Sequence, residues 1–297
     1  MEFEERFAGE QACVEYLQKL RWPNGFICPR CGSNRSWLTK RTLYHCHDCG
    51  LQTSVLAGTV FQDTKKPLRL WFRAMWHLTN QKYGANALGL QRIMGFGSYR
   101  TSWAWLHKLR QAMVRPGRDK LSGTIEVDET YVGGEKPGKR GRGAAGKALV
   151  VIAAQQDRSR IGRIRLGRVG DASGESLGSF VEAAVERGSA VHTDGWQGYS
   201  ELGRLGYRHR VVRRSADVGD NMLPLAHRVA ALLKRWLLGT YQGAVRPSHI
   251  DYYLDEYTFR FNRRTSRSRG KLFYRLAQQA VVTDPLLVKN LSGGRKS

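Results

Sequence analysis

Four of the five cysteines have the spacing of metal ligands. They form two C-x-x-C pairs separated by 14 residues: Cys28, Cys31, Cys46 and Cys49. Two such pairs on facing turns supply the tetrahedral sulfur set that Zn²⁺ prefers, and a zinc with four protein ligands is structural because no position stays open for substrate. The alternatives are two disulfides, four buried thiols, or His45 or His47 in place of one cysteine. The spacing favours a zinc ribbon.

Two aspartates have the positions of catalytic metal ligands. In the segment TIEVDETYV, strand alternation puts Ile125 and Val127 on one face, so that Glu126 and Asp128 share the other. Asp194 directly follows a second apolar segment, AVHT. A carboxylate on a central strand needs a hydrogen bond or a cation, because burying it bare is costly. Mg²⁺ binds carboxylates together with phosphate oxygens, and two ions about 4 Å apart would hold the attacking and leaving oxygens of a phosphoryl transfer.

The elements that must position these aspartates follow an ordered pattern. Strand-like segments at 124–132, 148–155 and 161–169 precede a helical segment, SLGSFVEAAVERG, and a fourth strand that ends at Asp194. The first acid then lies on the first strand and the second lies just after the fourth strand. This order is the ribonuclease H-like pattern, and a last pair of helices follows it.

The region before these strands is predicted to be helical on both sides of the cysteines. Residues 4–20 have the apolar spacing of an amphipathic helix, residues 26–56 alternate like short strands, and residues 66–113 are helical in pattern. Within the last stretch two helices flank the turn GFGS at 95–98, with Ser98 as the expected N-cap. A short turn before a basic amphipathic helix is typical of a helix-turn-helix that reads the DNA major groove, although any helix pair in a bundle has the same pattern.

The charge indicates a polyanionic partner. The chain has 49 Lys and Arg against 25 Asp and Glu, a net charge of +24, and nucleic acid is the first candidate for such an excess. The residues expected to contact DNA lie away from the apolar face of the second helix and in the segment RFNRRTSRSRGK: Arg100, Lys108, Arg110, Arg263 and Arg264. A Gly/Lys/Arg-rich stretch at 134–147 is either a hairpin tip or a DNA clamp.

Composition excludes several other classes of protein. Apolar residues make up 41% of the chain, which is enough to build a core and excludes a wholly disordered chain. No run approaches the ~18 consecutive apolar residues of a membrane-spanning helix. The start, MEFEERFAGE, lacks the basic-then-apolar order of a signal peptide. We therefore expect a cytoplasmic, nucleoid-associated protein without a membrane partner.

Several motifs give the chain a family resemblance. It carries a C-P-x-C-G ribbon, V-D-E-T-Y-V-G-G, H-T-D-G-W-x-G-Y, and L-K-R-W-L-L-G-T followed by Y-L-D-E-Y-T-F-R-F-N-R-R. With these motifs it resembles zinc-ribbon insertion-sequence transposases of the ISXO-like group (insertion-sequence 1595 family), which are related to the Merlin elements. The resemblance implies a transposase that binds the terminal inverted repeats of double-stranded DNA, cuts there and joins the 3′ hydroxyl to target DNA. It also implies Mg²⁺ or Mn²⁺ held by a triad that includes Asp128 and Asp194, and a homodimer or higher oligomer that synapses two ends.

The third ligand departs from the family pattern, which has Glu on a helix after the fifth strand and Lys or Arg seven residues later. Counting back seven from Lys234 gives His227, an imidazole that suits Mn²⁺ better than Mg²⁺. Asp255 and Glu256 in the next helix are the alternative ligands. The alternative functions are a non-catalytic or inactivated transposase-derived DNA-binding protein, and a plain nuclease that hydrolyses DNA without strand joining.

The expected fold is α+β with several domains. In chain order they are an N-terminal helix (1–25), a zinc ribbon (26–60), a helix-turn-helix-like DNA-binding region (61–118), a ribonuclease H-like α/β catalytic domain (119–285) and a basic tail (286–297).

Overall fold

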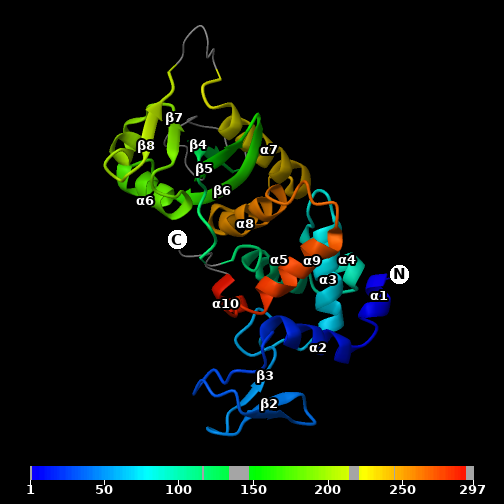
Figure 1. Ribbon diagram of the computed structural model, residues 1–297. Helices are drawn as coiled ribbons and strands as arrows, with labels where there is room; N and C mark the ends of the chain where they lie inside the picture. The colour runs from blue at the N-terminus through cyan, green and yellow to red at the C-terminus, as the bar shows by residue number, and fades with distance from the viewer. Residues whose placement is uncertain (1, 116, 134–146, 214–220, 244, 292–297) are drawn as a thin grey trace. The chain divides into compact units, whose positions relative to one another are not determined.

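The computed structural model divides into two compact units, coloured along the chain in Figure 1. Unit 1 comprises Met1–Arg115 with Ser266–Leu291, and unit 2 comprises Pro116–Thr265. The structure describes residues 2–115, 117–133, 147–213, 221–243 and 245–291, so the Gly/Lys/Arg-rich stretch up to residue 146 and the end of the basic tail lie outside the described residues. Among the described helices, none has the length and apolar character needed to cross a membrane.

Unit 1 is built on helices from both ends of its sequence. They are α1 (Glu2–Arg6), α2 (Glu10–Arg21), α3 (Leu68–Asn80), α4 (Ala87–Met94), α5 (Tyr99–Gln111), α9 (Arg269–Ala280) and α10 (Val288–Leu291). The single helix expected at 4–20 is two helices, because Gly9 between them is extended (φ −128°, ψ 166°). The ring of Phe273 on α9 packs 5.6 Å from that of Phe7 and 5.5 Å from that of Phe72, between ring centroids. This packing places 266–291 in unit 1, whereas the expected catalytic domain runs to 285.

Helices α4 and α5 form the predicted pair around the GFGS turn. Asn86 caps α4, because its side chain accepts a hydrogen bond from the backbone N–H of Gly89 at 2.7 Å. Gly95 ends α4 in the left-handed region (φ 66°), where glycine is favoured. Ser98 precedes α5 as expected, but its side chain makes no capping hydrogen bond.

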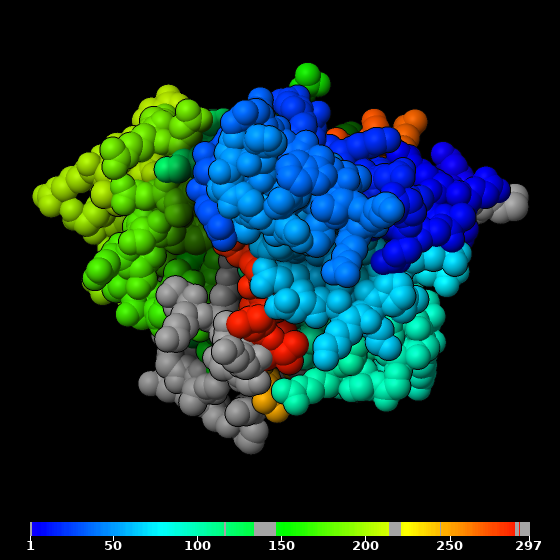
Figure 2. All heavy atoms as spheres, turned by 90° about the horizontal axis from the view of Figure 1, so that it is seen from below, coloured from blue at the N-terminus to red at the C-terminus, as the bar shows by residue number. Residues whose placement is uncertain are grey.

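The cysteine segment folds as a small antiparallel sheet. Its strands are β1 (Ser36–Leu38), β2 (Leu43–Cys46) and β3 (Gln52–Ser54), in the order β1-β2-β3. The Arg21 side chain at the end of α2 donates to the carbonyls of Ser54 and Val55, at 3.2 and 2.8 Å, which joins the ribbon to the N-terminal helices. Figure 2 shows the ribbon in lighter blue beside those helices in dark blue.

Unit 2 contains a five-stranded mixed sheet. Its strands are β4 (Thr124–Val132), β5 (Ala148–Asp157), β6 (Arg160–Val169), β7 (Ala190–Thr193) and β8 (Arg208–Val211). In the order β6-β5-β4-β7-β8, β5 is antiparallel to its neighbours β6 and β4, and β7 and β8 run parallel to β4. The three successive strands predicted from alternation are confirmed almost to the residue, and the central strand β4 carries Asp128.

Helices cover both faces of this sheet (Figure 1). Helices α7 (Pro224–Tyr241) and α8 (Ile250–Phe261), joined by the short η2 (Pro247–His249), pack on the face that contains Val150 and Ile152. Helix α6 (Gly174–Ala184) and the short η1 (Gln197–Leu202) pack on the face that contains Ile125 and Val127. Because β4 is buried on both sides, each polar side chain on it must find a partner inside the unit.

Candidate active site and zinc centre

The four predicted cysteines converge on one point of the ribbon. The Sγ atoms of Cys28 and Cys49 are 3.5 Å apart, as are those of Cys31 and Cys46, and all four lie within 4.8 Å of one another. A tetrahedron with Zn–S bonds of about 2.3 Å has sulfurs about 3.8 Å apart, so the set has the dimensions of a zinc site. The described cysteines form no disulfide. The four-cysteine ribbon therefore supports a structural zinc.

Two equivalent turns present these sulfurs. In the first, the N–H of Gly32 donates to the carbonyl of Cys28, and in the second the N–H of Gly50 donates to that of Cys46. Both glycines have positive φ, 74° and 70°, which a side chain would disfavour. His45 instead packs its ring on Trp37, so it does not replace a cysteine.

The sheet brings the two aspartates to the same edge. Ile125 of β4 pairs with Val191 of β7, and Glu126 pairs with His192. Asp194 directly follows β7, and its negative charge raises the pKa of Asp128, so the two carboxylates lie near each other. The sharp turn after Asp194 requires Gly195 (φ 83°), where a Cβ would lie 2.6 Å from Val211 Cγ1.

Asp128 lies in a strongly acidic surrounding. Its side chain is 15% exposed, and its pKa is raised to about 7, first by burial and then by the negative charges of Glu129 and Asp194. Lys234 opposes the shift. A buried carboxylate with two acidic neighbours favours the arrival of a cation, because a cation removes the repulsion among them.

His227 lies next to Asp128, although it is 99 residues away in sequence. Its Nε2 is 3.4 Å from Asp128 Oδ2, and its Nδ1 is 2.6 Å from Asn221 Oδ1. A carbonyl oxygen can only accept, so Nδ1–H donates to Asn221 and Nε2 is the ring atom on the side of Asp128. Lys234, two helical turns along α7, has its pKa lowered by desolvation and by Lys147, while Asp128 opposes that shift.

Glu126 fixes the helix that carries His227, and sequence reasoning missed this role. Helix α7 begins at Leu223-Pro224 without a side-chain cap of its own. Glu126, which is 8% exposed, accepts hydrogen bonds from the backbone N–H groups of Leu225 and Ala226 at 2.7 and 2.9 Å. The absence of Ser, Thr, Asp or Asn at the start of α7 was the available signal that an acceptor comes from elsewhere.

Sequence reasoning also missed a hydrogen bond on the opposite face of β4. The hydroxyl of the fully buried Tyr199 donates to Glu129 Oε2 at 2.9 Å, and burial raises the pKa of Tyr199 well above its usual range. Tyr199 is therefore a core residue. Trp196 packs partly against the same core, and its Nε1–H donates to the carbonyl of Ala172 at 2.9 Å.

Glu256, an alternative third ligand, is already bound to other side chains. Glu256 on α8 is completely buried, with its Oε1 2.8 Å from Arg260 Nε and its Oε2 3.2 Å from the Tyr241 hydroxyl. Its neighbour Asp255 lies on the same helix. Among the described residues, the only compact group of three or more potential ligands that converges is the cysteine set, so Asp128, Asp194 and His227 are neighbours rather than a closed cluster.

The residues of α5 that were expected to bind DNA differ in how exposed they are. Arg100 is exposed at the start of α5, and Lys108 is half-buried with a pKa lowered by desolvation. Arg110 is 1% exposed and donates to the carbonyl of Ala85 at 3.2 Å. The expectation that Arg110 faces DNA is wrong, because its long stem and guanidinium fill the helical core of unit 1.

Two arginines of the second basic segment, Arg263 and Arg264, make contacts within unit 2. The guanidinium of Arg263 lies 4.1 Å from the ring centroid of Phe259, and that of Arg264 lies 4.2 Å from that of Phe261. Arg264 also donates to the carbonyl of Gly162, in the β5–β6 hairpin region. Arg264 thus holds the end of α8 to the sheet, and DNA contact by either arginine stays a prediction.

Fold and site together define a zinc-ribbon protein with a mixed α/β unit that carries one aspartate on its central strand and a second just after the neighbouring strand. A family model described as an ISXO2-like transposase domain matches residues 120–262, and one described as a transposase zinc-ribbon domain matches residues 8–52. A similar protein from Halobacterium salinarum, described as "Uncharacterized protein in transposable element ISH50", is 26% identical over 290 residues, which cover 89% of this chain and 94% of that protein. These matches confirm the resemblance seen in the motifs: residues 120–262 match an ISXO2-like transposase domain, and residues 8–52 match a transposase zinc ribbon.

Among solved structures, the chain is similar to one in a structure titled "CryoEM structure of simian T-cell lymphotropic virus intasome in complex with PP2A regulatory subunit B56 gamma". The alignment has a TM-score of 0.33 and 10% identity, and it covers 67% of this chain and 74% of that one.

Proposed function

We propose that this protein is an active DNA transposase whose unit 2 is a ribonuclease H-like domain that cuts and joins strands by metal-dependent phosphoryl transfer. The observation that carries the proposal is the neighbourhood of Asp128: His227 is held 3.4 Å from it, and Asp194, which follows the adjacent parallel strand β7, is close enough for its negative charge to raise the pKa of Asp128. The strand order and the directions of the strands agree with this fold. The family supplies the reaction class, since its members are transposases.

The donor set fits a divalent metal. Two carboxylates and one imidazole nitrogen suit Mg²⁺ or Mn²⁺, with the imidazole favouring Mn²⁺. When bound, such a metal acts as a Lewis acid on phosphoryl oxygens and on the attacking hydroxyl or water. Asn221 orients the His227 ring by accepting from Nδ1–H, which leaves Nε2 for the site. The charge of Lys234 lies on the same side of α7 and would neutralise a DNA phosphate beside the carboxylates.

The partner is double-stranded DNA, namely the terminal inverted repeats and the target. The net charge of +24 supports a sequence-independent contact with the phosphate backbone. Arg100, Lys108, Arg263 and Arg264 are proposed as contributors; Arg110 is not, because it is buried. A homodimer or higher assembly follows from the need to hold two ends, and a nucleoid location follows from the substrate.

The test is strand cleavage and strand joining on duplexes that carry the element's own ends. We expect Asp128→Asn and Asp194→Asn to abolish both steps while end binding is kept, because only ligand charge is lost. Joined product distinguishes a transposase from a plain nuclease, and binding without any cleavage by the wild type would identify an inactivated protein.

The third ligand is tested in the same assay. We expect His227→Ala to be inactive and Glu256→Gln to retain activity at temperatures where it stays folded. Since Glu256 is paired with Arg260, melting of each variant is measured first. Loss of cleavage in a folded Glu256→Gln protein, with His227→Ala fully active, would assign the ligand to α8.

A further inference from the structure

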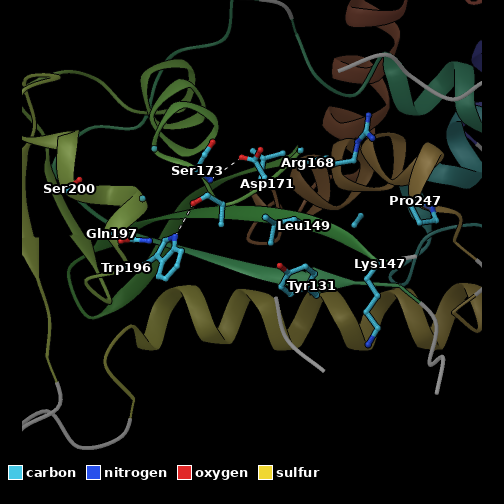
Figure 3. A pocket seen from close by; sticks show the side chains of 16 residues that line it. Tyr131, Lys147, Leu149, Arg168, Asp171, Ser173, Trp196, Gln197, Ser200 and Pro247 are labelled. Atoms are coloured by element: carbon cyan, nitrogen blue, oxygen red, sulfur yellow. Dashed lines mark hydrogen bonds between the residues drawn. The ribbon is translucent and has the colours of Figure 1, made fainter. Parts of the chain in front are cut away.

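Figure 3 shows a pocket of about 1010 Å³ in unit 2 whose lining on β4 faces away from the proposed metal ligands. Tyr131 is the β4 residue in this lining, and it is three residues from Asp128. Strand alternation puts side chains an odd number of residues apart on opposite faces of the sheet. The surface that continues from Asp128 is therefore on the face toward α7, across β7 and β8.

The register of the sheet puts a basic residue of β8 on that same face. Glu126 points toward α7, because it accepts hydrogen bonds from the first turn of this helix. His192 on β7 is the residue paired with Glu126, and Arg210 on β8 is the residue paired with His192. Residues paired directly across neighbouring strands have their side chains on one face. Arg210 therefore lies on the face that carries Glu126 and Asp128.

The α7 and α8 helices leave this part of the sheet accessible. Arg210 is exposed and His192 is half-buried, whereas the strand β5 is covered by both helices. Strand β8 is the edge of the sheet (Figure 1). Arg208, two residues before Arg210, shares its face and is also exposed, and its Nε–H donates to the carbonyl of Gly188 at 3.1 Å. Arg208 and Arg210 thus form a short row of positive charge, the β8 arginine row.

The charge of this segment fits a polyanion. From residue 202 to residue 216 the chain has five arginines and no Asp or Glu. Lys234, which is close enough to Asp128 for a Coulomb interaction, is on α7, and α7 packs over β5. Strand β8 lies beyond β7 on the other side of β4. Positive charges therefore flank the carboxylate of Asp128 on two sides, which suits a DNA strand with phosphates on both sides of the cleaved one.

The β8 arginine row lies within a few nucleotides of the proposed reaction centre. From Asp128 to Arg210 the sheet spans two strand spacings, about 10 Å, and two residues along the strands, about 7 Å. The two Cα atoms are then about 12 Å apart, or between three and four nucleotides at a rise of about 3.4 Å. Arg208 lies about 7 Å further along β8, on the side away from the carboxylates.

We propose that the β8 arginine row binds phosphates of the DNA strand that leaves the carboxylates across β7 and β8, with Arg210 nearer to the cleaved phosphate and Arg208 further from it. The inference rests on the proposed function, because it assumes that DNA lies across Asp128 and Asp194. It adds to the proposed site a path for the strand, made by an edge strand that the family motifs quoted above do not include.

The test is a binding measurement without divalent metal, so that it does not depend on cleavage. The probes are duplexes that carry the element's end, each with one phosphate near the junction replaced by an uncharged methylphosphonate. At a phosphate that Arg210 contacts, the replacement should weaken binding by the wild type roughly fivefold, the upper range for an exposed ion pair, and should have no further effect in Arg210→Gln. The phosphate that depends in the same way on Arg208→Gln should lie about two nucleotides further from the cleaved one.

Arg204→Gln is the matched control. It removes an arginine from the same segment, but Leu202 and Leu205 beside it pack on the opposite face of the sheet, and Arg204 is itself paired with Glu201 at 3.0 Å. We expect the control to leave every methylphosphonate penalty unchanged. Arg210→Gln should also lower the slope of log affinity against log salt by about 0.9, whereas Arg210→Lys, which keeps the charge, should restore both the slope and the penalty.

Methylphosphonate penalties that are the same in the wild type and in both β8 glutamine variants would overturn the proposal, and so would phosphate partners in the reverse order. Sedimentation without DNA adds a second readout: self-association lost in Arg210→Gln, with unchanged penalties, would assign the row to a protein partner and overturn the strand path. Metal-dependent cleavage by the wild type shows separately whether the proposed function holds. Coupling without cleavage would support the path and reject the active enzyme, and cleavage without coupling would do the opposite.

Discussion

Glu126 offers a sharp prediction because one buried carboxylate connects the two halves of the proposed metal site. It lies on β4 two residues before Asp128, and it accepts from the first turn of α7, which carries His227. Glu126→Ala removes the acceptor and leaves two backbone N–H groups in a buried position. Glu126→Gln keeps a carbonyl oxygen of the same reach and removes only the charge.

The magnitude follows from these contacts. A hydrogen bond to a charged group contributes about 1.5–3 kcal/mol, and loss of a helix cap costs about 0.5–2 kcal/mol. For two bonds to one oxygen we expect Glu126→Ala to destabilise unit 2 by about 2–4 kcal/mol and Glu126→Gln by about 1 kcal/mol. At roughly 2–4 °C per kcal/mol for a unit of this size, the melting temperature falls by about 5–15 °C for the alanine variant.

Calorimetry and strand cleavage below the melting temperature test this prediction together. Glu201→Ala is the matched control, since Glu201 makes only an exposed pair with Arg204 on the same unit and should change stability by less than about 0.5 kcal/mol. Cleavage should fall further in Glu126→Ala than in Glu126→Gln, because His227 loses its fixed distance from Asp128. Equal melting temperatures for Glu126→Ala and the wild type would refute the capping role.

The remaining predictions concern the ribbon, the DNA contact and pH. Cys28→Ser or Cys46→Ser should release about one zinc per chain and unfold the ribbon, which atomic absorption and proteolysis would show, while full zinc content would contradict the site. The logarithm of DNA affinity should fall with the logarithm of salt concentration by about 0.9 per phosphate contacted, so a slope near zero would exclude backbone contacts. Burial lowers the pKa of His209 in the native state, so as pH falls below about 6.5 the wild type should lose stability relative to a His209→Gln variant, whereas the raised pKa of Asp128 acts in the opposite direction in both proteins; the difference between their denaturant midpoints across this pH range provides the measurement.

Periodicity predicted the sheet of unit 2 well, for a physical reason. The first half of the strand 124–132 alternates between apolar and acidic residues, and Asp128 falls on the buried central strand, where a carboxylate needs a partner. The cysteine spacing was similarly informative, since only one geometry brings two C-x-x-C turns together. Predictions based on such local constraints agree with the structure to within two residues at the ends of β4, β5 and β6.

The sequence could not predict which residues that lie far apart in the chain come into contact in the fold. Arg110 has the spacing of a surface arginine, but it is buried because the carbonyl of Ala85 lies within its reach. The capping of α7 by Glu126 joins residues about 100 positions apart. Residues 266–291 follow unit 2 in sequence, yet Phe273 completes an aromatic cluster with Phe7 and Phe72. No local pattern contains such pairings.

Binding of Mn²⁺, followed by the loss of its free-ion electron paramagnetic resonance signal, tests the central claim most directly. The measurement uses zinc-loaded protein with end DNA, so that the ribbon is filled and the phosphate oxygens are present. We predict binding by the wild type that weakens at least about tenfold in Asp128→Asn, Asp194→Asn and His227→Ala, and that is unchanged in the surface control Glu201→Gln. Equal Mn²⁺ affinity in the wild type and in both aspartate variants would contradict a metal site at this sheet edge.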